Sequence, residues 1–118
     1  MDQGEVIAYY SRPAALSGRR DVYGVYIQGA SMAPRFQEGE VVFVDPKRPP
    51  QIGDDVLVFL RIEEDGSERI TACLIKRLVR RTAQHVELEQ FNPLTTFRID
   101  RAQISKVHRV IPWGELMA

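Results

Sequence analysis

Short segments in which apolar and polar residues alternate dominate this chain, and long helical periodicity is hard to find. Alternation with a period of two residues is typical of β-strands that bury one face. The segments are rich in β-branched and aromatic residues, and Asp65-Gly66 between two of them favours a tight hairpin turn. We therefore predict an all-β fold of several mostly antiparallel strands. The predicted strands span residues 22–28, 41–44, 55–62, 68–80, 86–89 and 103–111.

The chain length fits one domain. It has 118 residues, and single domains mostly contain about 100–150. We assign residues 1–20 to a flexible N-terminal arm or linker and residues 21–118 to one compact domain. Residues 46–54 are predicted to form a loop, because their prolines cannot donate hydrogen bonds to a sheet.

Charge and cysteine content exclude several classes of protein. The 16 basic residues balance the 16 acidic ones, whereas a domain that grips nucleic acid by itself usually carries a basic excess. Cys73 is the one cysteine, so the chain forms no internal disulfide and no cysteine-rich zinc site. We expect no metal, no cofactor and a reducing compartment. Neither a membrane span nor a signal peptide is visible, and we expect the protein in the cytoplasm.

The most informative segment is a serine on a predicted tight turn. A strand ends near Gly29, Ser31 follows at the turn, and Pro34 favours a tight turn or one short helical turn. Such a turn can present a hydroxyl beside backbone N–H groups, as an oxyanion-stabilising nucleophile requires. The alternative is that Ser31 simply caps the turn. Neither the G-x-S-x-G elbow of α/β-hydrolases nor the S-x-x-K motif of β-lactamases is present.

A nucleophilic serine needs a general base, and the histidines are weak candidates. His85 lies in a polar turn and His108 on a terminal strand, where a surface position is expected for both. A lysine can replace histidine when burial lowers its pKa, because desolvation disfavours the ammonium form. Lys76 fits this requirement, since Leu74 and Leu78 lie on the same face of its strand.

The strand pattern leaves a second interpretation of Lys76 open. Arg77 has apolar neighbours on its own face, so the pattern does not show which face is buried. In this alternative, Lys76, Arg77, Arg80 and Arg81 form a solvated basic rim whose aliphatic stems cover apolar surface.

Taken together, the motifs resemble the LexA-like family, which comprises the self-cleaving C-terminal domains of LexA and phage repressors, with UmuD and signal peptidase as relatives. The resemblance covers residues 22–113. It is carried, in the order of the family, by GASMAP at 29–34, GEVVFVD at 39–45, GDDV at 53–56 and IKRL at 75–78.

The resemblance implies a Ser–Lys dyad on an all-β peptidase and dimerisation domain. Ser31 matches the nucleophile, Lys76 the general base, and the backbone N–H groups of Ala30 and Ser31 the oxyanion hole. It further implies a homodimer. In the family, self-cleavage separates this domain from a DNA-binding domain, often after contact with a RecA filament, as part of the SOS response.

Several function classes follow from these observations. The first is the regulatory domain of a LexA-type or phage-type (prophage) repressor that contacts DNA only through a domain absent from this chain. The second is a non-catalytic dimerisation or sensor domain, because no Ala-Gly or Cys-Gly pair precedes Ser31. A UmuD-like polymerase accessory protein is a further alternative. A signal-peptidase-like enzyme is disfavoured by the lack of a membrane anchor.

Overall fold

The computed structural model describes residues 6–10 and 21–116 and is almost entirely β-structure. The remaining elements of the described chain are a 3-10 turn, η2 (Arg101–Gln103), and a short C-terminal helix, α1 (Trp113–Leu116). The strands within these ranges are β1 (Val6–Tyr10), β2 (Tyr23–Ile27), β3 (Val41–Asp45), β4 (Asp55–Glu64), β5 (Ser67–Arg81), β6 (His85–Phe91), β7 (Leu94–Asp100) and β8 (Ile104–Val110).

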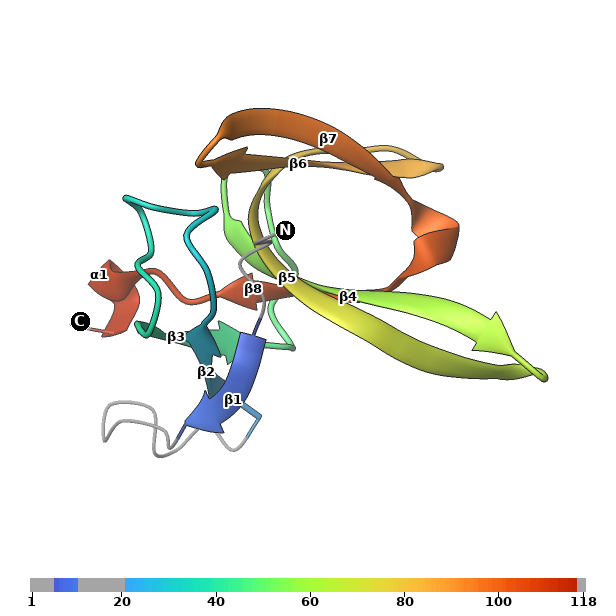
Figure 1. Cartoon of the computed structure of the whole chain (residues 1–118), viewed down its shortest axis with the longest axis horizontal. Coiled ribbons are helices and arrows are strands. Elements are labelled where there is room, and N and C mark those ends of the chain that lie inside the picture. The colour runs from blue at the N-terminus through green and yellow to red at the C-terminus, as the bar shows by residue number, and fades with distance from the viewer. Residues whose placement is uncertain (1–5, 11–20, 117–118) are drawn as a thin grey trace.

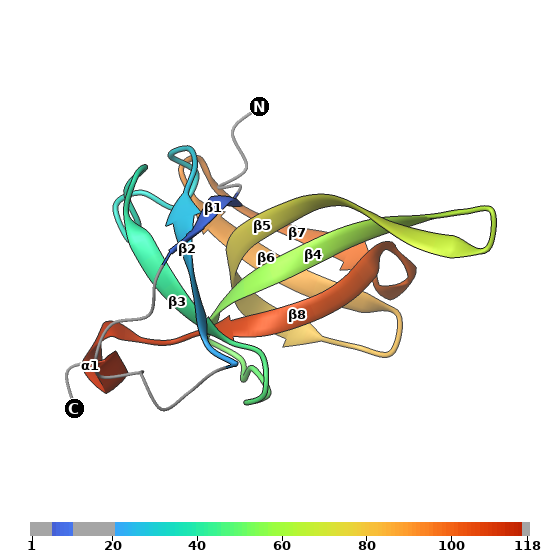
Figure 2. The same cartoon turned by 90° about the horizontal axis from the view of Figure 1, so that it is seen from below.

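These strands form one antiparallel sheet in the order β1-β2-β3-β8-β4-β5-β6-β7. The sheet is strongly curled, so that β6 and β7 pass over β4 and β8 (Figures 1 and 2). Bulges within β5 and β8 accompany this curl, since an extra residue bends a strand and increases its twist. The fold is the all-β class predicted from the sequence.

The core has two main parts, which lie on opposite faces of β4 and β5. We call them the first and the second core cluster. Alternate residues of β4 contribute to each cluster, which explains why residues 56–60 form an unbroken apolar run in the sequence. The first cluster contains Val25, Ile27, Met32, Val42, Val44, Leu57, Phe59, Ile75 and Val110. The second contains Val56, Val58, Leu74, Leu78, Val86 and Leu88.

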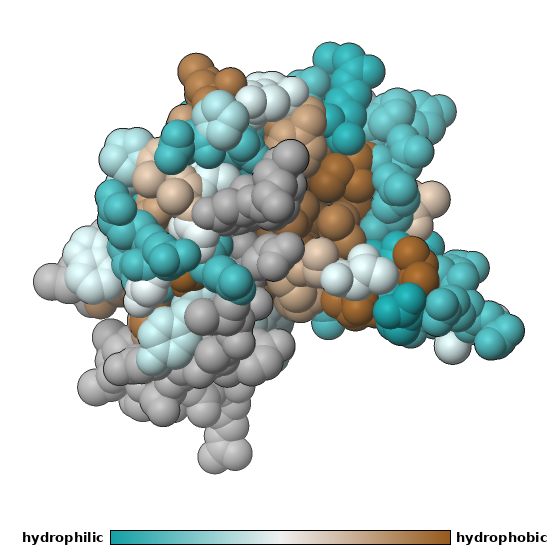
Figure 3. Space-filling view, in the orientation of Figure 1, coloured by the Kyte–Doolittle hydropathy of each residue, from teal (hydrophilic) through white to brown (hydrophobic). Residues whose placement is uncertain are grey.

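The β4–β5 hairpin extends beyond the curled sheet (Figures 1 and 2). Asp65 and Gly66 both have positive φ at its tip, as an Asp-Gly turn requires. Its surface is mostly hydrophilic in Figure 3, although Ile62 and Ile70 are about two-fifths exposed, at 40% and 41%. The hairpin tip is therefore a solvated extension and not part of the core.

Most elements match the predicted ranges, and the differences are local. The six predicted strands correspond to β2, β3, β4, β5, β6 and β8, and residues 46–54 contain no strand. Two strands, β1 and β7, and helix α1 were not predicted. Strand β1 lies within the predicted arm 1–20, where it pairs with β2; the other residues of that arm lie outside the described ranges. No helix among the described residues is long and apolar enough to span a membrane.

Candidate active site

Ser31 lies on a compact turn that links β2 to β3. Gly29 reaches φ +92°, a conformation that favours glycine, and its N–H donates to Glu38 Oε2 at 2.9 Å. The turn is closed by the Ala33 N–H to the Ala30 carbonyl and by the Phe36 N–H to the Met32 carbonyl, both at 3.0 Å. This last bond closes the predicted helical turn, although residues 31–35 form turns rather than a regular helix.

Two buried residues, Ser31 and Met32, anchor the turn in the core. Met32 is fully buried, at 0% exposure, within the first core cluster, and Ser31 beside it is 1% exposed. An exposed cap would leave the serine hydroxyl in water. Here the hydroxyl faces the protein interior.

Lys76 approaches Ser31 from the middle of β5. It pairs with Val56 on the neighbouring strand β4 and is completely buried, at 0% exposure. Its Nζ lies 2.9 Å from Ser31 Oγ, within direct hydrogen-bond distance. The fold thus brings together two side chains 45 positions apart in the sequence.

The basic rim predicted as the alternative contains the arginines but not the lysine. Arg77 is exposed, and its guanidinium lies 3.4 Å from Glu89 on the neighbouring strand. Arg80 and Arg81 are exposed as well. Lys76 therefore points inward while its neighbours of like charge point to solvent, which resolves the question that the strand pattern left open.

Neither histidine contacts the serine in the bonds that the structure gives. His85, at the start of β6, has its Nε2 3.2 Å from Asp100 Oδ1 at the end of β7. His108 accepts from or donates to the Tyr23 hydroxyl at 2.8 Å and is half-buried, so the expected surface position is wrong for this residue. Burial, together with the charge of Lys106, lowers the pKa of His108 below its ordinary value.

The turn between β6 and β7 also holds the serine segment, and the sequence interpretation missed it. The Phe91 and Asn92 N–H groups donate to the Ser31 carbonyl at 2.9 and 2.8 Å. Asn92 Nδ2 donates to the Ala30 carbonyl at 3.2 Å. The available signal was the Asn-Pro pair at 92–93, which marks a turn in the sequence but does not indicate what that turn contacts.

An ion pair ties the other end of the serine turn to β4. Arg35 Nε lies 2.9 and 2.7 Å from the two carboxylate oxygens of Asp55, the first residue of β4. Asp55 is buried while Arg35 is half exposed. Hydrogen bonding to Asp55 raises the pKa of Arg35 above its ordinary value.

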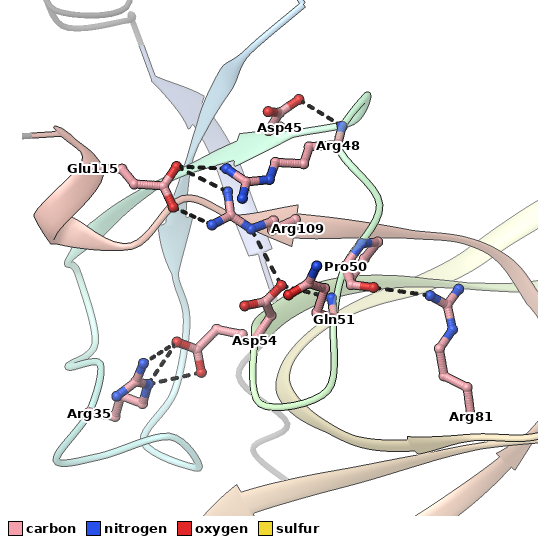
Figure 4. Close-up of polar contacts among 10 residues, drawn as sticks. Arg35, Asp45, Arg48, Pro50, Gln51, Asp54, Arg81, Arg109 and Glu115 are labelled. Carbon is pink, nitrogen blue, oxygen red and sulfur yellow. Dashed lines mark hydrogen bonds and ion pairs between the residues drawn. The ribbon is translucent and has the colours of Figure 1, made fainter.

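A second charged cluster lies at the C-terminal end of β8 (Figure 4). Arg109 is almost completely buried and contacts Asp54 at 3.3 Å as well as the carboxylate of Glu115 on α1. Arg48 from the 46–54 loop also approaches Glu115, at 3.4 Å. The cluster thus joins α1, β8 and the loop. No set of three His, Cys, Asp or Glu residues within the described part of the chain is arranged to hold a metal ion.

Fold and site together define a class: an all-β domain in which a buried serine on a turn meets a buried lysine on a central strand. Comparison with known proteins agrees with this class. Residues 2–111 match the family described as Peptidase S24-like. The chain belongs to the Peptidase S24-like family.

One relative is the Repressor protein C of Rhizobium phage 16-3, which is 36% identical over 112 residues. That alignment covers 95% of this chain but 43% of the relative, so the chain spans less than half of the relative's length. No solved structure matches the chain.

Proposed function

We propose that this chain is the C-terminal regulatory domain of a phage-type transcriptional repressor, and that Ser31 and Lys76 cleave a peptide bond joining it to a DNA-binding domain. The single observation that carries the proposal is the 2.9 Å contact between Ser31 Oγ and Lys76 Nζ, made by two side chains that are 1% and 0% exposed. A buried hydroxyl beside a buried amine is the arrangement that a Ser–Lys dyad requires.

The chemistry assigns one role to each group. Neutral Lys76 takes the proton of Ser31 Oγ as the oxygen attacks a peptide carbonyl carbon. The backbone N–H groups of Ala30 and Ser31 are the donors proposed for the resulting oxyanion. Lys76 then donates the proton to the leaving amine. Lys76, neutral again, then deprotonates a water molecule that hydrolyses the ester on Ser31. This step releases the new carboxylate and returns the proton to Ser31 Oγ.

Burial explains why a lysine can act as the base at this position. Removing an ammonium group from water disfavours its charged form, so we expect a lowered pKa for Lys76. Arginine in the same place would stay charged, because its guanidinium does not deprotonate in proteins. Only the neutral amine can accept the serine proton, and the cleavage rate should therefore rise with pH.

The repressor part of the proposal rests on the relative's name and on charge. The relative is a phage repressor, and more than half of its length lies outside the match. The balanced charge of this chain suits a domain that leaves phosphate contacts to another part of the protein.

We further propose a cytoplasmic homodimer whose cleavage is prompted by a RecA filament. Edge strands β1 and β7 are the sheet edges that pairing can cover.

The proposal is tested with an N-terminal extension that carries an Ala-Gly pair. We expect cleavage of the extension by the wild-type chain, followed by mass spectrometry, and no cleavage by Ser31→Ala, Lys76→Ala or Lys76→Arg. Arg77→Ala, at the exposed neighbouring position, is the matched control and should retain the wild-type rate. Cleavage that persists without Ser31 or Lys76 contradicts the dyad. An inert wild type leaves the non-catalytic dimerisation or sensor domain as the function.

A further inference from the structure

The β6–β7 turn fixes the orientation of two successive peptide groups at the serine. The Ala30 carbonyl accepts a bond from Asn92 Nδ2 at 3.2 Å, in addition to the bond from Ala33. The next carbonyl, that of Ser31, accepts bonds from the Phe91 and Asn92 N–H groups at 2.9 and 2.8 Å. Three donors from residues 91–92 thus hold the carbonyl oxygens on either side of the Ser31 α-carbon.

Peptide geometry converts these carbonyl contacts into an orientation of N–H groups. A trans peptide is planar, and its C=O and N–H bonds point in opposite directions. The cis bonds of the described chain are Ala33–Pro34 and Asn92–Pro93, so the peptide that joins Ala30 to Ser31 is trans. When Asn92 holds the Ala30 carbonyl, the Ser31 N–H is directed away from Asn92 and cannot rotate without breaking that bond.

We propose that Asn92 is a positioning residue that aims the Ser31 N–H at the oxyanion of the transition state. The inference rests on the proposed function, because it concerns the same site. Its energetic basis is preorganisation: a donor that is already aimed stabilises developing negative charge without a cost of reorientation. In the hydrogen bonds that the structure gives, the Asn92 side chain contacts neither Ser31 Oγ nor Lys76 Nζ. It acts through the backbone of the serine turn.

The surroundings of Asn92 favour a positioning role over a packing role. Its side chain is exposed, so truncation removes no core contact. The bond from its backbone N–H to Ser31 survives any substitution except proline, which keeps the β6–β7 turn attached. Loss of the amide therefore affects the orientation of one peptide group and leaves the core clusters intact.

Two substitutions and one control separate these roles. Asn92→Ala removes the amide, and Asn92→Asp keeps its shape but replaces the donor with an oxygen that repels the Ala30 carbonyl. The control is Gln90→Ala, because Gln90 Nε2 donates to the Pro93 carbonyl at 3.2 Å within the same turn, a bond of equal length that does not involve the serine segment. The readout is labelling of Ser31 by a fluorophosphonate, in which Ser31 Oγ displaces fluoride from phosphorus and the phosphoryl oxygen occupies the oxyanion position.

We expect both Asn92 variants to be labelled about tenfold to a hundredfold more slowly than the wild type. This loss is smaller than the roughly hundredfold to thousandfold loss of rate that follows removal of an oxyanion donor itself. The labelling rate of Gln90→Ala, corrected for its folded fraction from thermal unfolding, should stay within about twofold of the wild-type rate. The pH midpoint of labelling should be unchanged in all variants, because Lys76 sets it. Wild-type labelling rates in both Asn92 variants, or an equal loss in Gln90→Ala, overturn the inference.

A second measurement keeps the inference independent of activity. If wild-type Ser31 is not labelled at all, the proposed function fails, and ¹⁵N relaxation decides the positioning role. We expect a lower order parameter for the Ser31 N–H in Asn92→Ala than in the wild type or in Gln90→Ala. An unchanged order parameter shows that Asn92 does not hold this peptide group.

Discussion

At the scale of single residues, Lys76 is the least ordinary feature of the molecule. Lysine is almost never fully buried unless it is paired or functional. Lys76 is at 0% exposure, and Leu74 and Leu78 beside it on the same strand belong to the second core cluster. Burying an amine in such surroundings costs free energy that a purely structural residue would avoid. We therefore attribute the residue to function rather than to stability.

This attribution predicts that Lys76→Met stabilises the fold while it abolishes cleavage. Methionine has a similar length and no polar group to desolvate, and we expect a gain of about 1–3 kcal/mol in the free energy of unfolding near neutral pH. A lysine whose pKa is lower in the folded state costs stability below that pKa, and the cost fades as pH rises toward the unfolded value. The gain should therefore shrink in alkaline urea denaturation experiments. A less stable Lys76→Met variant contradicts this account.

At the scale of elements, the Arg35–Asp55 ion pair connects the serine turn to the start of β4. Arg35→Ala leaves the buried Asp55 carboxylate without this partner, and we expect a loss of about 1 kcal/mol, discounted because Arg35 is half exposed. The matched control is Arg69→Ala, since Arg69 pairs with Glu64 at 3.0 Å on the exposed hairpin. That variant should lose at most about 0.5 kcal/mol. Equal losses in urea titrations show that Arg35 is an ordinary surface partner.

The elements also show how far the sequence determines the fold. The hairpin of β4 and β5 is predictable because Asp65-Gly66 specifies the turn and apolar residues continue on both sides. Strand β7 is not, because its residues are mostly exposed and only Phe97 and Ile99 pack against the second core cluster. The missed β1 has strand-like residues, but at the N-terminus they were assigned to an arm. Its pairing with β2 is a long-range choice that local pattern does not encode.

The site follows the same division. Ser31 and its turn are readable from glycine and proline at fixed offsets, and the resemblance adds Lys76 as its partner. The inward direction of Lys76 is not readable, because apolar residues flank both Lys76 and Arg77 along a strand buried on both faces. Asn92 is missed altogether, since its side-chain bond to the serine turn spans 62 positions and exists only after the sheet has curled.

At the scale of the whole molecule, the charged cluster around Arg109 fastens the C-terminal helix to the sheet. The hydrogen bond from Arg109 lowers the pKa of Glu115 below its ordinary value. A carboxylate with a lowered folded pKa contributes stability above its unfolded pKa, and that contribution is lost as pH falls through the folded value. The cluster should therefore weaken in acid.

We expect Glu115→Gln to unfold at a slightly lower temperature than the wild type at neutral pH, by an amount equivalent to about 0.5 kcal/mol because Glu115 is partly exposed. The two proteins should converge as pH falls through the lowered pKa of Glu115, because the wild-type carboxylate is then protonated in the folded as well as the unfolded state. Thermal unfolding across this range measures the convergence. A difference that persists unchanged in acid means that the Glu115 charge does not stabilise the helix contact.

The central claim for the whole molecule is that a buried, uncharged lysine makes one serine reactive. The most direct measurement is the rate at which a fluorophosphonate modifies the chain as a function of pH, with the modified residue located by mass spectrometry. We predict that the label is on Ser31, that its rate rises with pH to a plateau, and that Lys76→Ala abolishes it. Labelling spread over other serines, or a Ser31 rate that is the same with and without Lys76, contradicts the claim.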